Sequence, residues 1–167
     1  MGSRVLDIAC GTGDLLLELA PRCTEVAGVD LDAAKIAYAL GRGNAMCRFA
    51  VADATSLPFD NDHFDVATLS MALHGMSDGA RRETLVEALR VAPKVIVLDY
   101  AAPLPTNATA WVLRLVERSS PAVHLAGFRS FLAQGGVAPL ARACGLQASS
   151  AGLVLSGCLE LWTVQRG

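Results

Sequence analysis

The sequence predicts an α/β fold, in which helices cover both faces of a mostly parallel sheet and a C-terminal strand runs antiparallel. Three observations lead to this prediction. Before residue 101, five short runs are almost continuously apolar, as in parallel strands buried on both faces. Stretches with helical spacing separate several of these runs, as strand–helix–strand crossovers require. Residues 146–165 hold two strand-like runs around Ser156 and Gly157, which indicate a hairpin.

Length and composition indicate one domain of a cytoplasmic protein. The chain has 167 residues, of which 53% are hydrophobic, and a net charge of −2. This length suffices for one substantial core, and no block of Lys and Arg predicts a nucleic-acid surface. No apolar run reaches the roughly 18–20 residues of a membrane span. Asp7, Asp14 and Glu18 interrupt the apolar start, so a secretory signal is not predicted.

The first hundred residues read as strands separated by helices. The predicted strands are residues 5–9, 25–30, 47–53, 64–71 and 94–100, and the predicted helices are residues 15–20, 33–40 and 78–92. Thr12 or Asp14 is placed to cap the first helix, and Asp32 is placed to cap the second. The second and third helices carry apolar residues at spacings of three and four, so each has one face for the sheet.

The pattern changes after Tyr100. A helix is predicted at residues 109–118, followed by a helical region that Gly135 and Gly136 interrupt and then by the hairpin. The segment 101–128 carries apolar side chains that could cover an apolar ligand but equally suit a core or a dimer face: Trp111, Leu113, Leu115 and Val116.

The five cysteines predict neither a metal site nor a disulfide framework. Their number is odd and no two stand at C-x-x-C spacing. We expect free thiols that pack as small apolar groups, including Cys10 inside the glycine turn.

A glycine turn joins the first strand to the first helix. In "VLDIACGTGDLLLELA", Gly11 and Gly13 let the backbone approach a ligand, and the helix start offers unpaired N–H groups. A dinucleotide site would place a third glycine where Leu16 stands, and a P-loop needs a Lys-Ser/Thr pair that does not follow here. The turn therefore predicts a nucleotide-type ligand without a pyrophosphate, or a tight turn that binds nothing.

Two carboxylates follow neighbouring strands. Asp30 ends the second predicted strand and Asp53 ends the third. In an open α/β sheet, this end of the strands lines the ligand crevice, and a carboxylate there can accept both hydroxyls of a ribose. Either aspartate alone suits a turn or a helix cap. Together with the glycine turn, they predict a nucleoside ligand.

Four segments resemble the class I S-adenosylmethionine-dependent methyltransferases, above all the small-molecule group that includes the quinone-biosynthesis C-methyltransferases. "VLDIACGTGD" is similar to the family's first motif, with Ala9 where glycine is usual. "VADATSLPFDNDHFD" resembles the family's "GDAxxLPFxDxSFD", and "MALHGM" resembles "xxLHHV". "GGVAPLARACGL" resembles the late helix that ends in an A-G-[FL] turn. The resemblance covers nearly the whole chain. It implies a Rossmann-like seven-stranded sheet and an enzyme that transfers a methyl group from S-adenosylmethionine to a small molecule.

The resemblance assigns cofactor-binding roles by position. Asp30 would bind the ribose hydroxyls, Asp53 would accept the adenine amino group, and the Ala54 N–H would meet the ring. Asp7 would orient the ammonium of the methionine portion, directly or through water. The remaining expected contacts are the turn residues Ala9, Gly11 and Gly13 and the strand-end residues Leu31 and Ser70.

Candidates for the acceptor side follow the fourth and fifth strands. Methyl transfer from a sulfonium needs mainly proximity and orientation, and it needs a base only if the acceptor must lose a proton. His74 is the candidate base, because it follows a strand end that faces the expected crevice; the alternative is a hydrogen-bonded structural histidine. Leu73, Tyr100 and Arg129 are the candidate substrate-binding residues, with packing or a surface role as their alternatives.

The resemblance also implies helices before the first strand, which help to cover substrate and cofactor. Here the first motif starts at Val5, so residues 1–167 are expected to form a single S-adenosylmethionine-binding domain without this lid. A partner subunit would cover the open crevice, and we therefore expect a homodimer. The alternative to an enzyme is a cofactor-binding or regulatory protein without catalysis. A nicotinamide-dependent oxidoreductase is disfavoured by Leu16.

Overall fold

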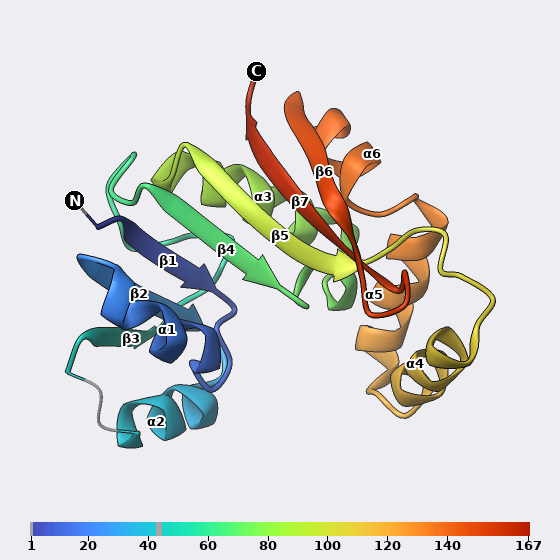
Figure 1. The fold of residues 1–167 in the computed structure, drawn as a ribbon, viewed down its shortest axis with the longest axis horizontal. Helices are drawn as coiled ribbons and strands as arrows, with labels where there is room; N and C mark the ends of the chain where they lie inside the picture. Colours follow the sequence, from blue (N-terminus) through green and yellow to red (C-terminus); the bar gives the residue numbers. More distant parts are fainter. Residues whose placement is uncertain (1, 43–44) are drawn as a thin grey trace. The chain divides into compact units, whose positions relative to one another are not determined.

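Seven strands form one sheet in the computed structural model, which describes residues 2–42 and 45–167 (Figure 1). The strand order is β3-β2-β1-β4-β5-β7-β6. The strands are β1 (Arg4–Ile8), β2 (Glu25–Asp30), β3 (Cys47–Val51), β4 (Val66–Ser70), β5 (Lys94–Tyr100), β6 (Leu146–Val154) and β7 (Leu159–Arg166). Contacts within the chain divide it into two compact units, residues 1–70 with 83–95 and residues 71–82 with 96–167.

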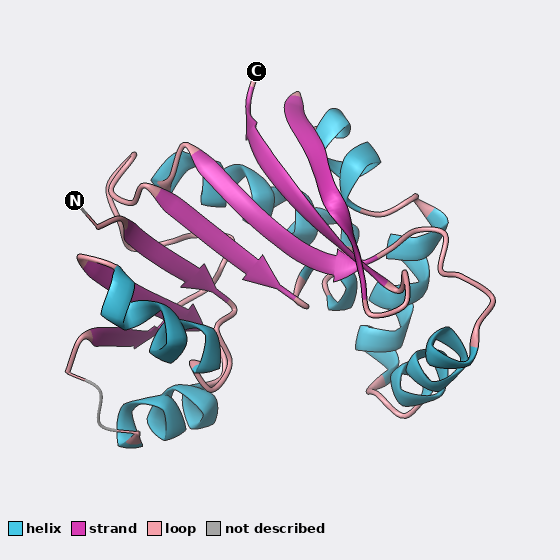
Figure 2. Ribbon diagram, in the orientation of Figure 1, coloured by secondary structure: helices cyan, strands magenta, loops and turns pink. Residues whose placement is uncertain are grey.

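The first unit carries the parallel strands β1 to β4. β1 pairs in parallel with β2 on one side and with β4 on the other, and β2 pairs in parallel with β3. Its helical segments are α1 (Asp14–Leu19), the 3₁₀ turn η1 (Ala20–Arg22), α2 (Ala33–Gly41) and most of α3 (Asp78–Val91). Because the four strands point the same way, the segments that follow β1, β2 and β3 leave from the same edge (Figure 2).

The second unit contains the C-terminal hairpin and three helices. β6 and β7 pair antiparallel, with an irregularity between Ser150 and Gly152. The helical segments are the 3₁₀ turn η2 (Leu73–Gly75), α4 (Ala108–Arg118), α5 (Ala122–Ala133) and α6 (Val137–Ala143). The predicted break at Gly135 and Gly136 lies between α5 and α6, where both glycines have positive φ.

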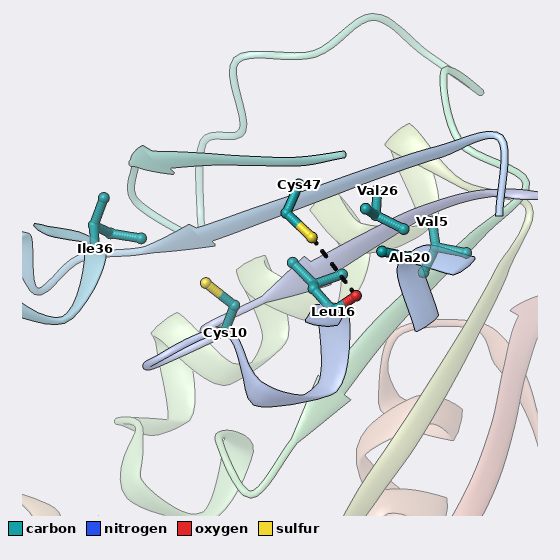
Figure 3. Close-up of a cluster of buried hydrophobic side chains, with 7 residues drawn as sticks. All are labelled: Val5, Cys10, Leu16, Ala20, Val26, Ile36 and Cys47. Atoms are coloured by element: carbon teal, nitrogen blue, oxygen red, sulfur yellow. Dashed lines mark hydrogen bonds between the residues drawn. The ribbon is translucent and has the colours of Figure 1, made fainter. Parts of the chain in front are cut away.

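The core of the first unit explains how a leucine replaces the third glycine of a dinucleotide turn. Leu16 is fully buried in a cluster with apolar side chains of β1, β2, β3 and the two helices (Figure 3). A Cβ at Gly28 of β2 would lie 2.5 Å from Leu16 Cδ1. The glycine that allows close helix–strand packing therefore stands on the strand, and the large side chain stands on the helix.

Most predicted elements are confirmed. The strands at residues 25–30 and 94–100 have the predicted bounds, and the predicted antiparallel hairpin is present. Asp32 caps α2, because its Oδ1 accepts hydrogen bonds from Ala34 N and Lys35 N. The cap predicted for the first helix is wrong: Gly13 is the N-cap, and Thr12 Oγ1 donates to Asp14 Oδ2 at 2.6 Å instead. In the described part of the chain, no helix is long and apolar enough to cross a membrane.

Candidate functional site

Asp30 holds the glycine turn in place. Its Oδ2 accepts a hydrogen bond from Gly11 N at 2.8 Å, and its Oδ1 accepts one from Asp32 N at 2.9 Å. The side chain is buried at the end of β2. Each carboxylate oxygen can accept more than one hydrogen bond. Asp30 can therefore fix the turn and still accept hydroxyl groups of a ligand.

The glycines of the turn have different surroundings. Gly11 and Gly13 both have positive φ, at 56° and 79°. A Cβ at Gly13 would lie 2.5 Å from the Phe49 ring, whereas a Cβ at Gly11 would meet nothing within 4 Å. Gly13 is thus needed for packing, and Gly11 leaves open space beside the backbone. Ala9 also has positive φ, at 58°, which explains why glycine is usual at this position in the family it resembles.

Asp7 is a carboxylate in an environment that disfavours its charge. It is 3% exposed, and its Oδ1 accepts a hydrogen bond from Thr68 Oγ1 at 2.6 Å. Burial raises the pKa of Asp7 to about 6; the Thr68 hydrogen bond opposes this rise, and the charge of Asp30 adds to it. A cationic ligand group beside Asp7 would favour the charged carboxylate.

Cys10 lies inside the turn and behaves as a packing residue. Its thiol is buried among apolar side chains (Figure 3). Burial raises the pKa of Cys10 to about 12, and the carboxylates of Asp7 and Asp30 add to this rise. A thiol with such a pKa is neither a nucleophile nor a metal ligand at neutral pH.

The other predicted cofactor residues of this unit are more exposed. Asp53 is exposed, and its Oδ1 accepts hydrogen bonds from Thr55 N and Oγ1, which lower its pKa. Leu31, which follows β2 directly, is 71% exposed, so an apolar side chain is available to a ring. Ala54 and Ser70, the last residue of β4, are half-buried.

The loop after Asp53 is attached to α3 by a pair of charged side chains. Glu87 Oε1 accepts a hydrogen bond from Leu57 N at 2.8 Å. Arg90 donates to the carbonyl oxygens of Phe59 and Leu57 and to Asn61 Oδ1. Glu87 and Arg90 also bind each other at 2.7 Å. The course of the loop is therefore set from α3, largely through its main chain.

In the second unit, His74 is buried in a network of polar and aromatic side chains. It is 3% exposed, and its Nδ1 lies 2.7 Å from Asp99 Oδ1. Its backbone N donates to Asp99 Oδ2 at 3.2 Å. Its ring packs edge-on against Tyr100, Phe128 and His124. The carboxylate of Asp99 therefore fixes the orientation of the imidazole.

Glu117 connects the remaining members of this network. Tyr100 Oη donates to Glu117 Oε1 at 2.8 Å, and burial and this hydrogen bond raise the pKa of Tyr100 far above its ordinary range. Glu117 Oε2 lies 3.0 Å from His124 Nε2, and Glu117 Oε1 lies 3.7 Å from His74 Nε2. The side chains of His74, Tyr100, Glu117 and His124 form one continuous cluster, contributed by η2, β5, α4 and α5 respectively.

Comparison with known proteins identifies the family. A family model described as a methyltransferase domain matches residues 5–94, more than half of the chain. The chain belongs to this methyltransferase family. The predicted resemblance to class I S-adenosylmethionine-dependent methyltransferases is confirmed, and so is the fold class.

Individual relatives that match this chain are named for quinone biosynthesis or for demethylmenaquinone. The ubiquinone/menaquinone biosynthesis C-methyltransferase UbiE of Azotobacter vinelandii is 37% identical over 61% of this chain and 44% of its own length. The demethylmenaquinone methyltransferase of Thermus thermophilus is 37% identical over 67% of this chain and 53% of its own length. The chain thus spans about half the length of the curated relatives it matches.

Solved structures agree with the methyltransferase fold. The PH0226 protein from Pyrococcus horikoshii is 20% identical, with a TM-score of 0.73. The match covers 100% of this chain and 83% of PH0226. Magnesium protoporphyrin IX methyltransferase from Synechocystis, solved with bound SAH, is 17% identical, with a TM-score of 0.68. The match covers 99% of this chain and 75% of the Synechocystis protein.

The predicted site residues of this chain fall into two groups. Those assigned to the cofactor all lie in the first unit: Asp7, Ala9, Gly11, Gly13, Asp30, Leu31, Asp53, Ala54 and Ser70. Those assigned to the acceptor all lie in the second unit: Leu73, His74, Tyr100 and Arg129. Leu73 and Tyr100 are buried with His74, whereas Arg129 is exposed on α5.

Among the described residues, sequence reasoning missed three buried charged side chains: Asp99, Glu117 and Arg81. Arg81 is 1% exposed; its Nε donates to Leu73 O, and its Nη2 donates to Met76 O and Gly127 O. It thereby fixes η2 against α5. A charged residue inside an apolar strand ("KVIVLDY") was the available signal for Asp99. Arg81 and Glu117 lie on helices rich in charged residues and gave no such signal.

Proposed function

We propose that this chain binds S-adenosylmethionine in its first unit and transfers the methyl group to a small-molecule acceptor. The observation that carries the proposal is the pairing of two buried carboxylates with a glycine turn. Asp30 bonds directly to the turn, and Asp7 stands on the neighbouring strand β1 with a raised pKa. A raised pKa beside an open turn is typical of a functional site.

The residues present fit the cofactor. Asp7 would pair with the ammonium group, and Asp30 would accept the ribose hydroxyls while it holds Gly11 N. The open space beside Gly11 admits a ligand to the backbone, and exposed Leu31 offers an apolar surface to the adenine. Asp53 and the Ala54 N–H would recognise the edge of the base. When bound, the cofactor supplies a methyl group already activated by a sulfonium.

The acceptor side rests on analogy with the relatives. Two of them are named for C-methylation in quinone biosynthesis and for demethylmenaquinone, which supports a small molecule of that kind. That His74 acts as a base stays a prediction. Its Nδ1 is held by Asp99, as in a histidine oriented for proton transfer, but its Nε2 faces Glu117. Leu73 and Tyr100 would line the acceptor pocket, and Arg129 would hold an anionic group.

Calorimetric titration with S-adenosylmethionine, S-adenosylhomocysteine and NAD tests the cofactor assignment. We expect both adenosyl compounds to bind and NAD to bind weakly or not at all. Asp30→Ala should weaken the binding of S-adenosylhomocysteine by about 1.5–3 kcal/mol, the usual contribution of hydrogen bonds to a charged group. Asp32→Ala is the matched control: it removes the α2 cap and costs about 1 kcal/mol of stability, but it should leave the affinity unchanged.

Two results would contradict this proposal. Unchanged affinity in Asp30→Ala would remove the ribose assignment, and preferential binding of NAD would remove the cofactor assignment. Binding of S-adenosylmethionine without transfer to any quinone-type acceptor would favour the alternative, a cofactor-binding protein without catalysis.

A further inference from the structure

We propose that His74, Glu117 and His124 form a binding site for one divalent transition-metal ion, with zinc as the best fit. The three side chains come from η2, α4 and α5, and each offers one ligand atom within 4.8 Å of the other two. Two imidazoles and one carboxylate are a common ligand set of zinc sites that keep a position open for water. Glu117 and His124 lie beyond the methyltransferase family match, which ends at residue 94, and the proposed cofactor site includes none of the three ligands.

The separations of the ligand atoms are close to those of tetrahedral coordination. Zinc bonds of about 2.0–2.2 Å to nitrogen and oxygen place neighbouring ligand atoms about 3.3 Å apart. Glu117 Oε2 lies 3.0 Å from His124 Nε2, and Glu117 Oε1 lies 3.7 Å from His74 Nε2. One ligand atom from each of the three residues lies within 4.8 Å of the other two, so no pair has to close by more than about 1.5 Å to reach this separation.

The ring arrangement gives a second geometric check. A ring bound through one nitrogen has its centre about 3.2 Å from the metal, so two rings at the tetrahedral angle have centres about 5 Å apart. The centres of His74 and His124 are 5.1 Å apart, and the rings are nearly perpendicular, at 85°. They can therefore approach one ion without a clash between the rings.

The partners of these ligands prepare them for a metal. Asp99 Oδ1 lies 2.7 Å from His74 Nδ1, which places the proton on Nδ1 and directs the lone pair of Nε2 towards Glu117. A carboxylate behind a metal-binding histidine is the usual outer partner of zinc ligands. Tyr100 Oη donates to Glu117 Oε1 and orients the third ligand in the same way. The lone pair of His74 Nε2 and the carboxylate repel each other unless a cation or a proton lies between them.

Charge balance also favours a cation. Asp99 is 1% exposed and Glu117 is 6% exposed, so two carboxylates are buried in this cluster. Buried carboxylates are stable as ions when they are paired or when they coordinate a metal. Arg81 contributes a charge that acts on Asp99. A divalent ion among His74, Glu117 and His124 would compensate both carboxylates at once.

The packing fixes the ring of His124 and leaves it accessible. A Cβ at Gly75 would lie 2.5 Å from two atoms of this ring, so the His124 ring fits only because residue 75 has no side chain. Gly127 similarly lets α5 approach the carbonyls of Gly75 and Met76. The side chain of His124 is 36% exposed, whereas those of His74 and Glu117 are buried. The ion would therefore enter past His124, and the fourth coordination position would hold water or an oxygen of a small molecule.

This site and a base at His74 exclude each other. A metal ion would use the Nε2 lone pair that a base would need, since Nδ1 is committed to Asp99. The metal site does not depend on S-adenosylmethionine, because its ligands all lie in the second unit.

Titration of the chelator-treated protein with cobalt(II) chloride tests the inference. We expect one ion per chain and the intense visible absorption of four-coordinate cobalt, lost again when zinc is added. Zinc should also raise the melting temperature, as binding to the folded state requires. His124→Asn should weaken cobalt binding roughly a hundredfold or more, because a ligand contributes at least as much as its outer partners. His124→Cys keeps a zinc ligand and should restore most of the zinc affinity.

His63→Asn is the matched control. His63 also lies beside a glutamate, with Nε2 3.6 Å from Glu25 Oε1, and belongs to the other unit. Equal cobalt binding in wild type, His124→Asn and His63→Asn would overturn the inference, as would only the weak spectrum of hydrated cobalt. S-adenosylhomocysteine affinity, measured in the same samples, separates the two proposals. If the wild-type protein does not bind S-adenosylhomocysteine, the proposed function is contradicted. If it binds S-adenosylhomocysteine but does not give the spectrum of four-coordinate cobalt, only the metal site is contradicted.

Discussion

Asp7 links pH to the stability of the fold. Its pKa is about 6 in the folded protein, against an ordinary value of 3.8, so the folded state holds this proton more tightly than the unfolded state. The resulting stabilisation is complete below about pH 4 and is lost as the pH rises through 6, by about 3 kcal/mol in all. Asp65, whose pKa Arg4 lowers, contributes in the opposite direction.

Asp7→Asn should remove this dependence. The amide keeps the size of the side chain but does not ionise. We therefore expect the variant to gain stability relative to wild type between pH 4 and pH 7, because the ionised carboxylate is no longer buried. Urea unfolding at several pH values measures the difference. A constant difference between the two proteins across this range would show that Asp7 does not titrate there.

The same carboxylate should make cofactor affinity depend on pH. The proposed function pairs the ammonium group of the cofactor with the ionised form of Asp7. With a pKa of about 6, the ionised fraction of Asp7 rises roughly tenfold between pH 5 and pH 7. We expect the affinity for S-adenosylhomocysteine to rise by a similar factor over this range in calorimetric titrations. In Asp7→Asn, affinity should be weaker and nearly flat with pH. A flat wild-type profile would argue that the ammonium lies elsewhere.

At the scale of the elements, the two glycines of the turn serve different purposes: Gly13 is required for packing, and Gly11 leaves space for a ligand. Alanine at Gly11 or Gly13 must adopt positive φ, which costs roughly 1–2 kcal/mol. At Gly13 the new methyl group also meets the Phe49 ring, which should cost about 1–3 kcal/mol more. Gly13→Ala should therefore melt well below Gly11→Ala. In contrast, Gly11→Ala should be the folded variant with the weaker S-adenosylhomocysteine affinity, because its methyl occupies the open space.

The backbone of the two variants provides the control for this comparison, since both place alanine at positive φ. Equal losses of stability would show that the Phe49 ring moves aside without cost. Unchanged affinity in Gly11→Ala would show that no ligand approaches this part of the turn.

Sequence alone predicted the strands of this protein well because their apolar runs are almost continuous and end sharply. The strand at Glu25–Asp30 ends at a carboxylate, and Lys94–Tyr100 begins after a proline. The first helix cap was predicted wrongly, since Gly13 takes the cap position by its backbone alone. The cluster around His74 was beyond prediction, because Asp99, Glu117 and His124 meet it through folding of distant segments.

At the scale of the whole molecule, the exposed apolar side chains of α4 and the start of α5 support the prediction of a homodimer. Trp111 is 66% exposed and Val123 is 79% exposed, and three further apolar residues between them are at least half exposed. Exposed apolar patches often mark association sites. We expect a dimer in light scattering at micromolar concentration.

Trp111→Glu should shift this dimer to the monomer, since it places a charge among the apolar side chains. Tyr38→Glu is the control: Tyr38 is equally exposed, at 63%, but lies on α2 in the other unit. A monomeric wild type would refute the dimer, and a dimer that persists in Trp111→Glu would place the contact elsewhere.

The attachment of the loop after Asp53 to α3 determines which residues in this region tolerate substitution. Glu87 and Arg90 contact mainly its main-chain atoms, which every residue type supplies. We therefore expect substitutions of the exposed residues Pro58 and Asp60 to preserve the course of the loop, and substitutions of Glu87 and Arg90 to disturb it. In a saturation library we expect many tolerated substitutions at the two loop positions and few on the helix. Variation can then accumulate beside Asp53 and Ala54, the residues proposed to bind the base, while the scaffold stays constant.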